Sequence, residues 1–160
     1  MDSIHYFQQK PINKFKWAQL DTYYILHINR NVEDVKSAIL EKDHLISWYT
    51  NDIIIKDTDS NKMEFKFGDI SAIALIKMDG NIIEWKYIDS TFEILIGNSL
   101  TFTLEEKEDK TRLLAEQNGF DLGSDMCANF NFSLAKYLES LRQYLQYGKK
   151  EGWGSEGYRS

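Results

Sequence analysis

Cysteine is almost absent from the sequence, since Cys127 stands alone among 160 residues. A single cysteine cannot form an intramolecular disulfide, which disfavours a small secreted scaffold held together by disulfides. The opening segment MDSIHYFQQKPINKFKW has no apolar signal core, and no run approaches the roughly 20 apolar residues that a membrane-spanning helix needs. We therefore expect a cytoplasmic protein without membrane insertion.

Basic residues are outnumbered by acidic ones. Lys and Arg together number 19 against 25 Asp and Glu, which gives a formal net charge of -6. Affinity for nucleic acid depends largely on Lys and Arg neutralising phosphates, and attraction to anionic lipids has the same requirement. The charge balance therefore predicts neither a nucleic-acid partner nor electrostatic docking on a membrane.

Histidine is also scarce. The three histidines, His5, His27 and His44, are scattered along the chain, and no pair has the spacing of metal ligands on one helix. We therefore predict no metal site.

Two other motifs partly match known binding loops, but each lacks a residue or a structural context that its loop requires. Asp57, Asp59 and Asn61 begin like a calcium loop, but Lys62 stands where such a loop requires glycine. We expect a polar hairpin turn there. Residues 152–157 spell the dinucleotide fingerprint GxGxxG, but they neither follow a predicted strand nor open a helix. We predict no cofactor.

No set of residues indicates catalysis. Cys127 is expected near the start of the last helix, where a helix dipole can activate a thiol, but a small core-facing or surface thiol is the simpler interpretation. Alternation places Glu84 on the outer face of its strand. Glu116 could face either way, because Leu113 and Leu114 are adjacent and leave the register open. We therefore predict no catalytic residue and favour a protein that is not an enzyme.

Apolar and aromatic residues are plentiful, at 42% and 14%, which is enough for one buried core. Residues 63–67 alternate Met, Phe and Phe with Glu and Lys, the pattern of a half-buried strand. Asp79-Gly80 is a hairpin signal between two such runs. Residues 91–97 are either a further strand or a loop. The predicted strands cover residues 23–28, 52–57, 63–67, 71–78, 83–87, 100–104 and 111–118.

Helices are predicted on both sides of this run of strands. Asn31 offers an N-cap for a short helix, and a second short helix is expected over residues 43–49. The last helix begins near Ser124 and is followed by Gly148, which is well placed as its C′ residue. An apolar stripe runs along one face of this last helix, formed by Met126, Phe130, Leu134, Leu138, Leu141 and Leu145.

This order predicts one α+β domain. Consecutive strands joined by short turns favour an antiparallel sheet, and its apolar face needs a cover that only the striped helix is long enough to give. We expect a curved sheet of about six or seven strands around the C-terminal helix. The predicted division is an N-terminal extension over residues 1–21, the domain over 22–148 and a flexible C-terminal tail over 149–160.

Four segments carry a resemblance to a known family. They are INRNVEDV at 28–35, LISWY at 45–49, IEWKY at 83–87 and LAKYLESL at 134–141. Together with the order of elements, they resemble the START-like (SRPBCC) superfamily. Within it they are most similar to the activator homologues of the heat-shock chaperone ATPase and to small bacterial START-like proteins. The activator homologues carry Gly-Trp where this chain has Ser133-Leu134.

The resemblance implies a helix-grip fold with a cavity between sheet and helix, which in many members binds a lipid-like or other apolar molecule. We therefore expect a binding protein for a small apolar ligand. The alternatives are a protein-interaction module such as a chaperone ATPase regulator, and an enzyme of the cyclase or hydrolase type. The residues expected to line the cavity are Phe65, Phe67, Trp85, Tyr87, Phe102, Phe130, Leu134 and Leu138.

The sequence leaves one alternative open at this predicted site. The same eight side chains could fill the core at normal packing density and leave no useful space. Apolar walls with a few polar tips, such as the indole N–H of Trp85 and the hydroxyl of Tyr87, suit a small-molecule site.

Overall fold

The computed structural model describes residues 22–119 and 125–159 of the chain. Its seven strands are β1 (Thr22–Ile28), β2 (Asp52–Asp57), β3 (Lys62–Phe67), β4 (Ile70–Asp79), β5 (Ile82–Ser90), β6 (Ser99–Lys107) and β7 (Lys110–Asn118). Its helices are α3 (Val32–Leu40), α4 (Lys42–Trp48), the 3₁₀ helix η1 (Glu93–Leu95) and α5 (Asp125–Tyr147).

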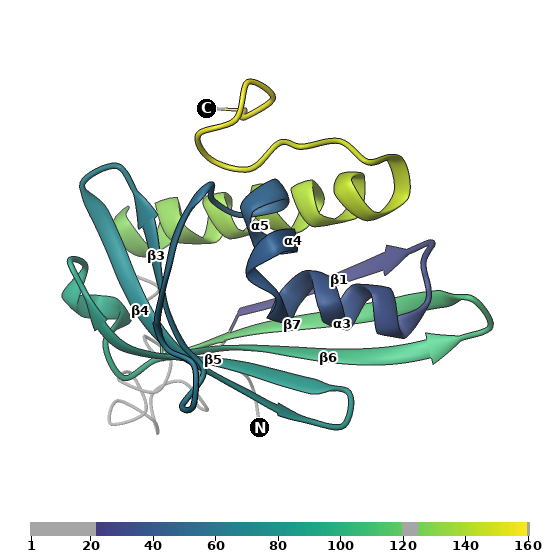
Figure 1. Cartoon of the computed structure of the whole chain (residues 1–160), viewed down its shortest axis with the longest axis horizontal. Helices are drawn as coiled ribbons and strands as arrows, with labels where there is room; N and C mark the ends of the chain where they lie inside the picture. The colour runs from purple at the N-terminus through teal and green to yellow at the C-terminus, as the bar shows by residue number, and fades with distance from the viewer. Residues whose placement is uncertain (1–21, 120–124, 160) are drawn as a thin grey trace, which may run out of the picture.

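All seven strands form one antiparallel sheet in the order β1-β7-β6-β5-β4-β3-β2. The sheet bends, and α5 lies along its concave side together with α3 and α4 (Figure 1). Neighbouring strands are also neighbours in sequence, except that β1 pairs with β7, where Ile25 lies opposite Leu114. The predicted α+β architecture is therefore confirmed, including the two short helices after the first strand.

The turns follow the local chemistry of the sequence. Gly80 has a φ of 59° in the β4–β5 turn, a backbone conformation that glycine adopts without steric cost. In the β2–β3 turn, Ser60 Oγ donates to Asp57 Oδ2 at 2.7 Å, and Asn61 has a φ of 52°. Residues 57–61 therefore form the predicted polar hairpin. Residues 91–97, for which the sequence allowed a strand or a loop, form a loop that contains η1.

The caps of α3 and α5 are those expected. Asn31 Oδ1 accepts a hydrogen bond from the backbone N–H of Asp34 at 2.9 Å, which satisfies one orphan donor of the first turn of α3. Arg30 pairs with Asp34 and donates to the carbonyl of Leu145 near the end of α5. Gly148 follows α5 with a φ of 69°, the left-handed conformation of a C′ glycine.

A column of aromatic side chains fills the core where α4 covers the sheet. The ring centroids of Trp85 lie 5.0 Å from Phe65, 5.0 Å from Phe102 and 6.3 Å from Trp48. All four side chains are essentially excluded from solvent. The indole Nε1 of Trp48 donates to the carbonyl of Ala38 at 2.7 Å, which ties α4 to α3.

The segment after α5 differs from the flexible tail that its glycines led us to expect. The backbone N–H of Trp153 donates to Tyr49 O at 2.9 Å, and that of Asn51 donates to Trp153 O at 3.1 Å. Gly152 lies so close to α4 that an added Cβ would be 3.0 Å from the carbonyl carbon of Trp48. In the described residues, the segment 149–159 therefore packs across the junction of α4 and β2, because backbone hydrogen bonds replace the missing apolar pattern.

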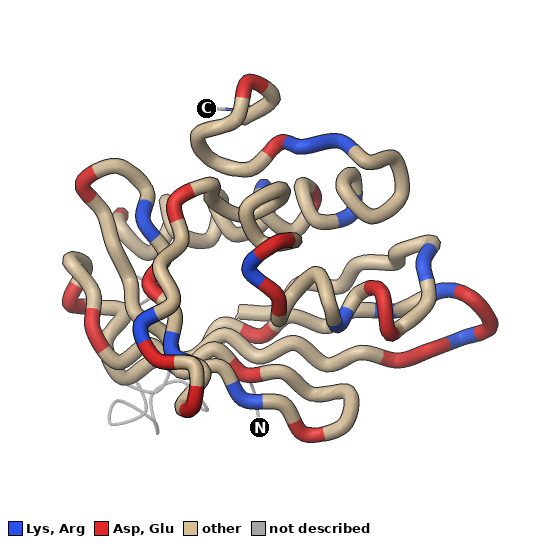
Figure 2. The backbone as a smooth tube through the Cα atoms, viewed as in Figure 1, with Lys and Arg blue, Asp and Glu red and all other residues tan. Residues whose placement is uncertain are grey.

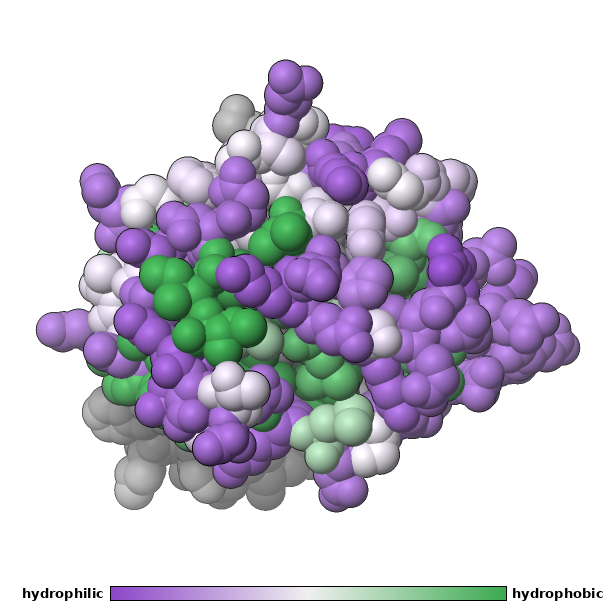
Figure 3. Space-filling view, in the orientation of Figure 1, coloured by the Kyte–Doolittle hydropathy of each residue, from purple (hydrophilic) through white to green (hydrophobic). Residues whose placement is uncertain are grey.

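Charged side chains are spread over the surface (Figure 2), and apolar side chains reach it at particular places. Many charged residues gather at the hairpin between β6 and β7, over residues 105–110 (Figure 2). Apolar side chains reach the surface over β2, where Ile54 and Ile55 are exposed (Figure 3). Within the described ranges, no helix combines the length and apolarity needed to cross a membrane.

The aromatic column predicts a large stability difference between two phenylalanines. Phe102 is 0% exposed and Phe132 is 70% exposed. We expect Phe102→Ala to lower the free energy of unfolding by about 3–5 kcal/mol through lost burial and a new cavity. Phe132→Ala is the matched control and should change it by less than about 0.5 kcal/mol. Urea denaturation at pH 7 measures both, and equal losses would contradict the described core.

Candidate functional site

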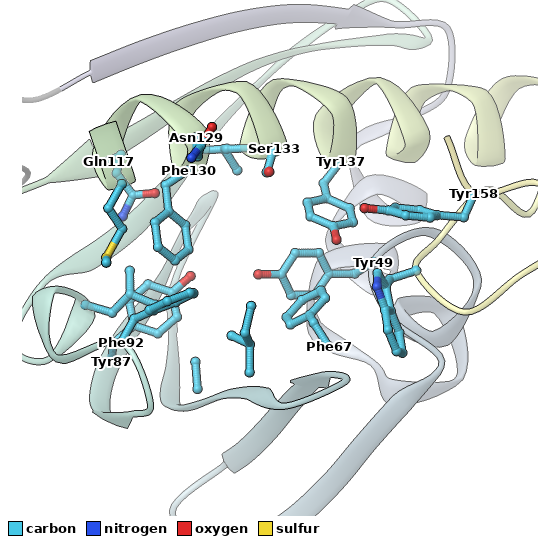
Figure 4. Close-up of a pocket in the computed structure, with 16 residues that line it drawn as sticks. Tyr49, Phe67, Tyr87, Phe92, Gln117, Asn129, Phe130, Ser133, Tyr137 and Tyr158 are labelled. Atoms are coloured by element: carbon cyan, nitrogen blue, oxygen red, sulfur yellow. The ribbon is translucent and has the colours of Figure 1, made fainter. Parts of the chain in front are cut away.

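A pocket with a volume of about 590 Å³ lies between the first half of α5 and the strands beneath it (Figure 4). Aromatic and aliphatic side chains make up most of its wall. The lining residues are Tyr49, Phe67, Ile70, Ala72, Tyr87, Phe92, Leu95, Gln117, Met126, Asn129, Phe130, Ser133, Leu134, Tyr137, Trp153 and Tyr158.

The position of the pocket follows from the unequal cover that α5 receives. Toward its C-terminal end, α5 packs against α3, α4 and β1, and Leu138, Leu141 and Leu145 of the apolar stripe are buried there. At its N-terminal end α5 still meets β1, where the Tyr24 hydroxyl donates to the carbonyl of Asn131, but the apolar stripe is less buried there. Met126 is 41% exposed and Phe130 is half-buried, and both face the pocket. The C-terminal residues of the stripe are therefore part of the core, and its N-terminal residues line a pocket.

The structure brings half of the predicted lining residues to the pocket. These are Phe67, Tyr87, Phe130 and Leu134. The other four do not line it: Phe65, Trp85, Phe102 and Leu138. Phe65, Trp85 and Phe102 belong to the aromatic column that Trp48 completes, and Leu138 is buried in α5. Strand alternation gives the face of a side chain but not its position along the cavity.

Four aromatic side chains that we did not predict close one end of the pocket. The ring of Tyr49, which follows α4, meets Phe67 at 5.2 Å and Tyr137 at 5.0 Å, both edge-on. Trp153 packs edge-on against Phe67 at 6.3 Å, and Tyr158 stacks on Tyr137 at 6.4 Å. Trp153 and Tyr158 come from the segment after α5. Their aromatic character was the available signal, but no periodicity placed that segment against the domain.

The hydroxyls of the buried tyrosines stay protonated. Burial raises the pKa of Tyr87 to about 12. Burial also raises the pKa of Tyr49 well above its ordinary value, and the neighbouring phenols of Tyr87 and Tyr137 raise it further. Burial, and then the hydrogen bond with Tyr158, raise the pKa of Tyr137. The hydroxyls of Tyr49 and Tyr87 point into the cavity, so they offer neutral hydrogen-bonding groups at physiological pH (Figure 4).

Gln117 lies at the opposite end of the pocket, below the first turns of α5 (Figure 4). It belongs to the inward-facing row of β7, which also contains Leu113 and Ala115. The residue is only 4% exposed, and its Nε2 has no hydrogen-bond partner among the described residues. This register turns Glu116 to the outer face, which settles the alternative that the sequence left open.

Among the described residues, the pocket wall has no charged side chain. The lining residues there include no Asp, Glu, Lys, Arg, His or Cys, and their polar groups are phenols, two amides, the indole N–H of Trp153 and the hydroxyl of Ser133. Elsewhere in residues 22–119 and 125–159, no three His, Cys, Asp or Glu side chains are grouped so that they could hold a metal ion. Cys127 is buried in α5 away from the pocket wall. The arrangement suits binding of a neutral molecule.

A second concavity lies along the β6–β7 hairpin and has a volume of about 920 Å³. Its lining includes Glu105, Glu106, Lys107, Glu108 and Lys110, all of which are exposed. This groove is therefore a space between solvated charged side chains, and the smaller apolar pocket is the stronger candidate site.

Comparisons with known proteins agree on the fold. No protein-family model matches the sequence, and no curated protein matches it. The Aha1 dimer from Colwellia psychrerythraea superposes with a TM-score of 0.71 at 23% identity, over 81% of this chain and 98% of that one. A START superfamily protein from Mycobacterium smegmatis has a TM-score of 0.64 at 11% identity, over 79% and 97%. XoxI from Bacillus cereus has a TM-score of 0.64 at 14% identity, over 79% and 96%. The chain therefore has the predicted START-like helix-grip fold.

The docked segment after α5 can be tested at Gly152. A Cβ at this position would press on the backbone of Trp48 and Tyr49, so we expect Gly152→Ala to separate the segment from α4. Hydrogen exchange of the Trp153 amide, which donates to Tyr49 O, should become at least about tenfold faster. Glu156→Ala, at an exposed position, is the control. Unchanged protection of Trp153 in the Gly152 variant would contradict the packing described here.

The pKa of Tyr87 predicts how stability falls in alkali. The phenol is neutral in the folded chain up to about pH 12, whereas in the unfolded chain it ionises near pH 10. Its contribution is therefore complete below pH 10 and is lost as the pH rises toward 12, by about 1.4 kcal/mol per pH unit. In urea titrations, Tyr87→Phe should lose stability less steeply over this range than the wild type. The control Tyr23→Phe, at an exposed position, should follow the wild-type curve.

Proposed function

We propose that this protein binds a small, neutral and largely apolar ligand in the pocket between the sheet and α5. The observation that carries the proposal is the pocket itself, with about 590 Å³ of space inside an aromatic wall. Small-molecule sites have volumes of roughly 300–1,000 Å³ and combine apolar walls with a few polar groups. The START-like fold supports the same interpretation, because it places a curved sheet opposite a long helix.

The chemistry of the wall supports a neutral ligand. A buried ion without a partner of opposite charge costs far more free energy than a buried hydrogen-bonded dipole. The lining residues that the structure describes offer no such partner, and the phenols of Tyr49 and Tyr87 keep their protons. A lining without carboxylate, imidazole or thiol groups also favours binding over acid–base or nucleophilic catalysis.

A second candidate function is a protein-interaction module, such as a chaperone ATPase regulator. One observation favours it: the edge strand β1 carries Tyr23 and Ile25 on its outer face, with 61% and 54% of their surfaces exposed. Exposed apolar side chains on a sheet edge can support pairing with another chain. The apolar pocket under α5 has no purpose in such a module, so ligand binding remains our first proposal.

Filling the pocket from α5 tests the proposal. Ser133 lines the pocket, while Ala135 on the same helix is exposed. The probe is N-phenyl-1-naphthylamine, a neutral dye whose fluorescence rises in apolar surroundings. We expect Ser133→Phe to weaken its binding at least about tenfold, because the new ring occupies the space that the dye needs. The matched control Ala135→Phe should bind the dye as the wild type does.

One further measurement strengthens this test, and one outcome of the dye titration would contradict the proposal. Native mass spectrometry of the purified wild type should show a retained small molecule that Ser133→Phe lacks. Equal dye affinity in Ser133→Phe and Ala135→Phe would place the dye outside the pocket and would count against the proposal.

A further inference from the structure

Within the proposed binding function, we infer that Gln117 determines ligand specificity. Its side-chain amide would select neutral ligands that carry an acceptor oxygen, such as a ketone carbonyl, at the end of the pocket below the first turns of α5. The inference rests on the proposed function for the existence of a ligand, and it adds the chemical group that the ligand must present.

The first argument is the free-energy cost of burying the side-chain amide of Gln117 without a partner for its nitrogen. Only 4% of the surface of Gln117 is exposed, and its Nε2 donor has no hydrogen-bond partner in residues 22–119 and 125–159. A buried donor without an acceptor loses its hydration without compensation, whereas an apolar side chain of similar size would not. Buried polar groups without partners are rare in folded proteins. This nitrogen has almost no accessible surface in this structure, so a ligand oxygen becomes its acceptor when the amide turns toward the pocket that Gln117 lines.

The second argument is that the sheet does not need this amide. The backbone of Gln117 lies between Thr22 of β1 and Leu100 of β6 in the strand register, so main-chain pairing fixes β7 on both sides. The next residue, Asn118, shows how an amide can serve the sheet itself, since its Nδ2 donates to Ser99 Oγ on the neighbouring strand at 3.1 Å. Gln117 makes no such link through its Nε2 and faces the pocket instead.

The third argument concerns the part of the ligand that lies beside Gln117. Phe92 and Phe130 meet edge-on at 5.0 Å on this side of the pocket, and the hydroxyl of Tyr87 points into the same space (Figure 4). Aromatic side chains favour a flat apolar partner, and a donor beside them helps to fix its orientation. The geometry therefore favours a planar ring system with a carbonyl at one edge, and an uncharged one because the described lining residues hold no counter-ion.

A matched pair of probes separates the carbonyl from the ring system. Fluorenone and fluorene have the same three fused rings and differ by one carbonyl oxygen. In titrations of the ¹⁵N-labelled full chain followed by NMR, fluorenone should bind the wild type at least about tenfold more tightly than fluorene. The side-chain NH₂ proton resonances of Gln117 should move downfield with fluorenone, as a new hydrogen bond requires, and fluorene should not produce this downfield shift.

Two variants assign this preference to Gln117. Gln117→Leu keeps the volume and removes the donor, so it should bind both probes with equal affinity and fold at least as stably as the wild type. Glu116→Gln changes the neighbouring residue, whose side chain lies on the outer face, and should keep the tenfold preference.

The outcomes distinguish this inference from the function on which it rests. If the wild type binds fluorene and fluorenone equally, the role of Gln117 is wrong while ligand binding in the pocket stands. If neither probe binds, both proposals fail for planar ligands. Should Gln117→Leu fail to fold, the shift of the wild-type amide resonances decides alone, and an unmoved NH₂ signal at saturating fluorenone overturns the inference.

Discussion

The arrangement of this protein depends on how the concave face of one bent sheet is covered. A sheet with an apolar face must bury that face against another element. Here α3, α4 and α5 cover different parts of it. Where α4 lies under α5, Trp48 completes a solid column with Phe65 and Trp85. Where α5 continues beyond Trp48, the described side chains that face it, among them Phe92 and Leu95, leave the pocket open. The core and the cavity are thus two halves of the same interface.

Local patterns in the sequence were sufficient for the architecture. Alternation along residues 63–67 and 83–87 predicted which side chains face inward, and Asn31 and Gly148 marked helix ends through their capping chemistry. These features depend on residues close together in the chain, so they can be read without knowing the fold. The resemblance to START-like proteins then supplied the curvature of the sheet, which no local pattern encodes.

The site was only half predictable, and the reason is physical. Phe65 and Phe67 are two residues apart on the same face of β3, yet one is sealed beneath Trp48 and the other lines the pocket. Which of them meets a helix depends on packing between distant segments. Gln117 was missed because the register of β7 was ambiguous around Leu113 and Leu114. Trp153 was missed because its segment is held by backbone hydrogen bonds, which leave no periodic signal in the side chains.

The pairing of β1 with β7 has a consequence for how the chain reaches this state. Among the described strands β1 comes first in the sequence, but it pairs with the last one, β7, and Tyr24 on β1 also donates to the carbonyl of Asn131 in α5. During synthesis, β1 must therefore wait until nearly the whole domain has left the ribosome. Contacts between such distant parts of a chain form slowly, and until then the backbone groups of β1 remain open to pairing with other nascent chains.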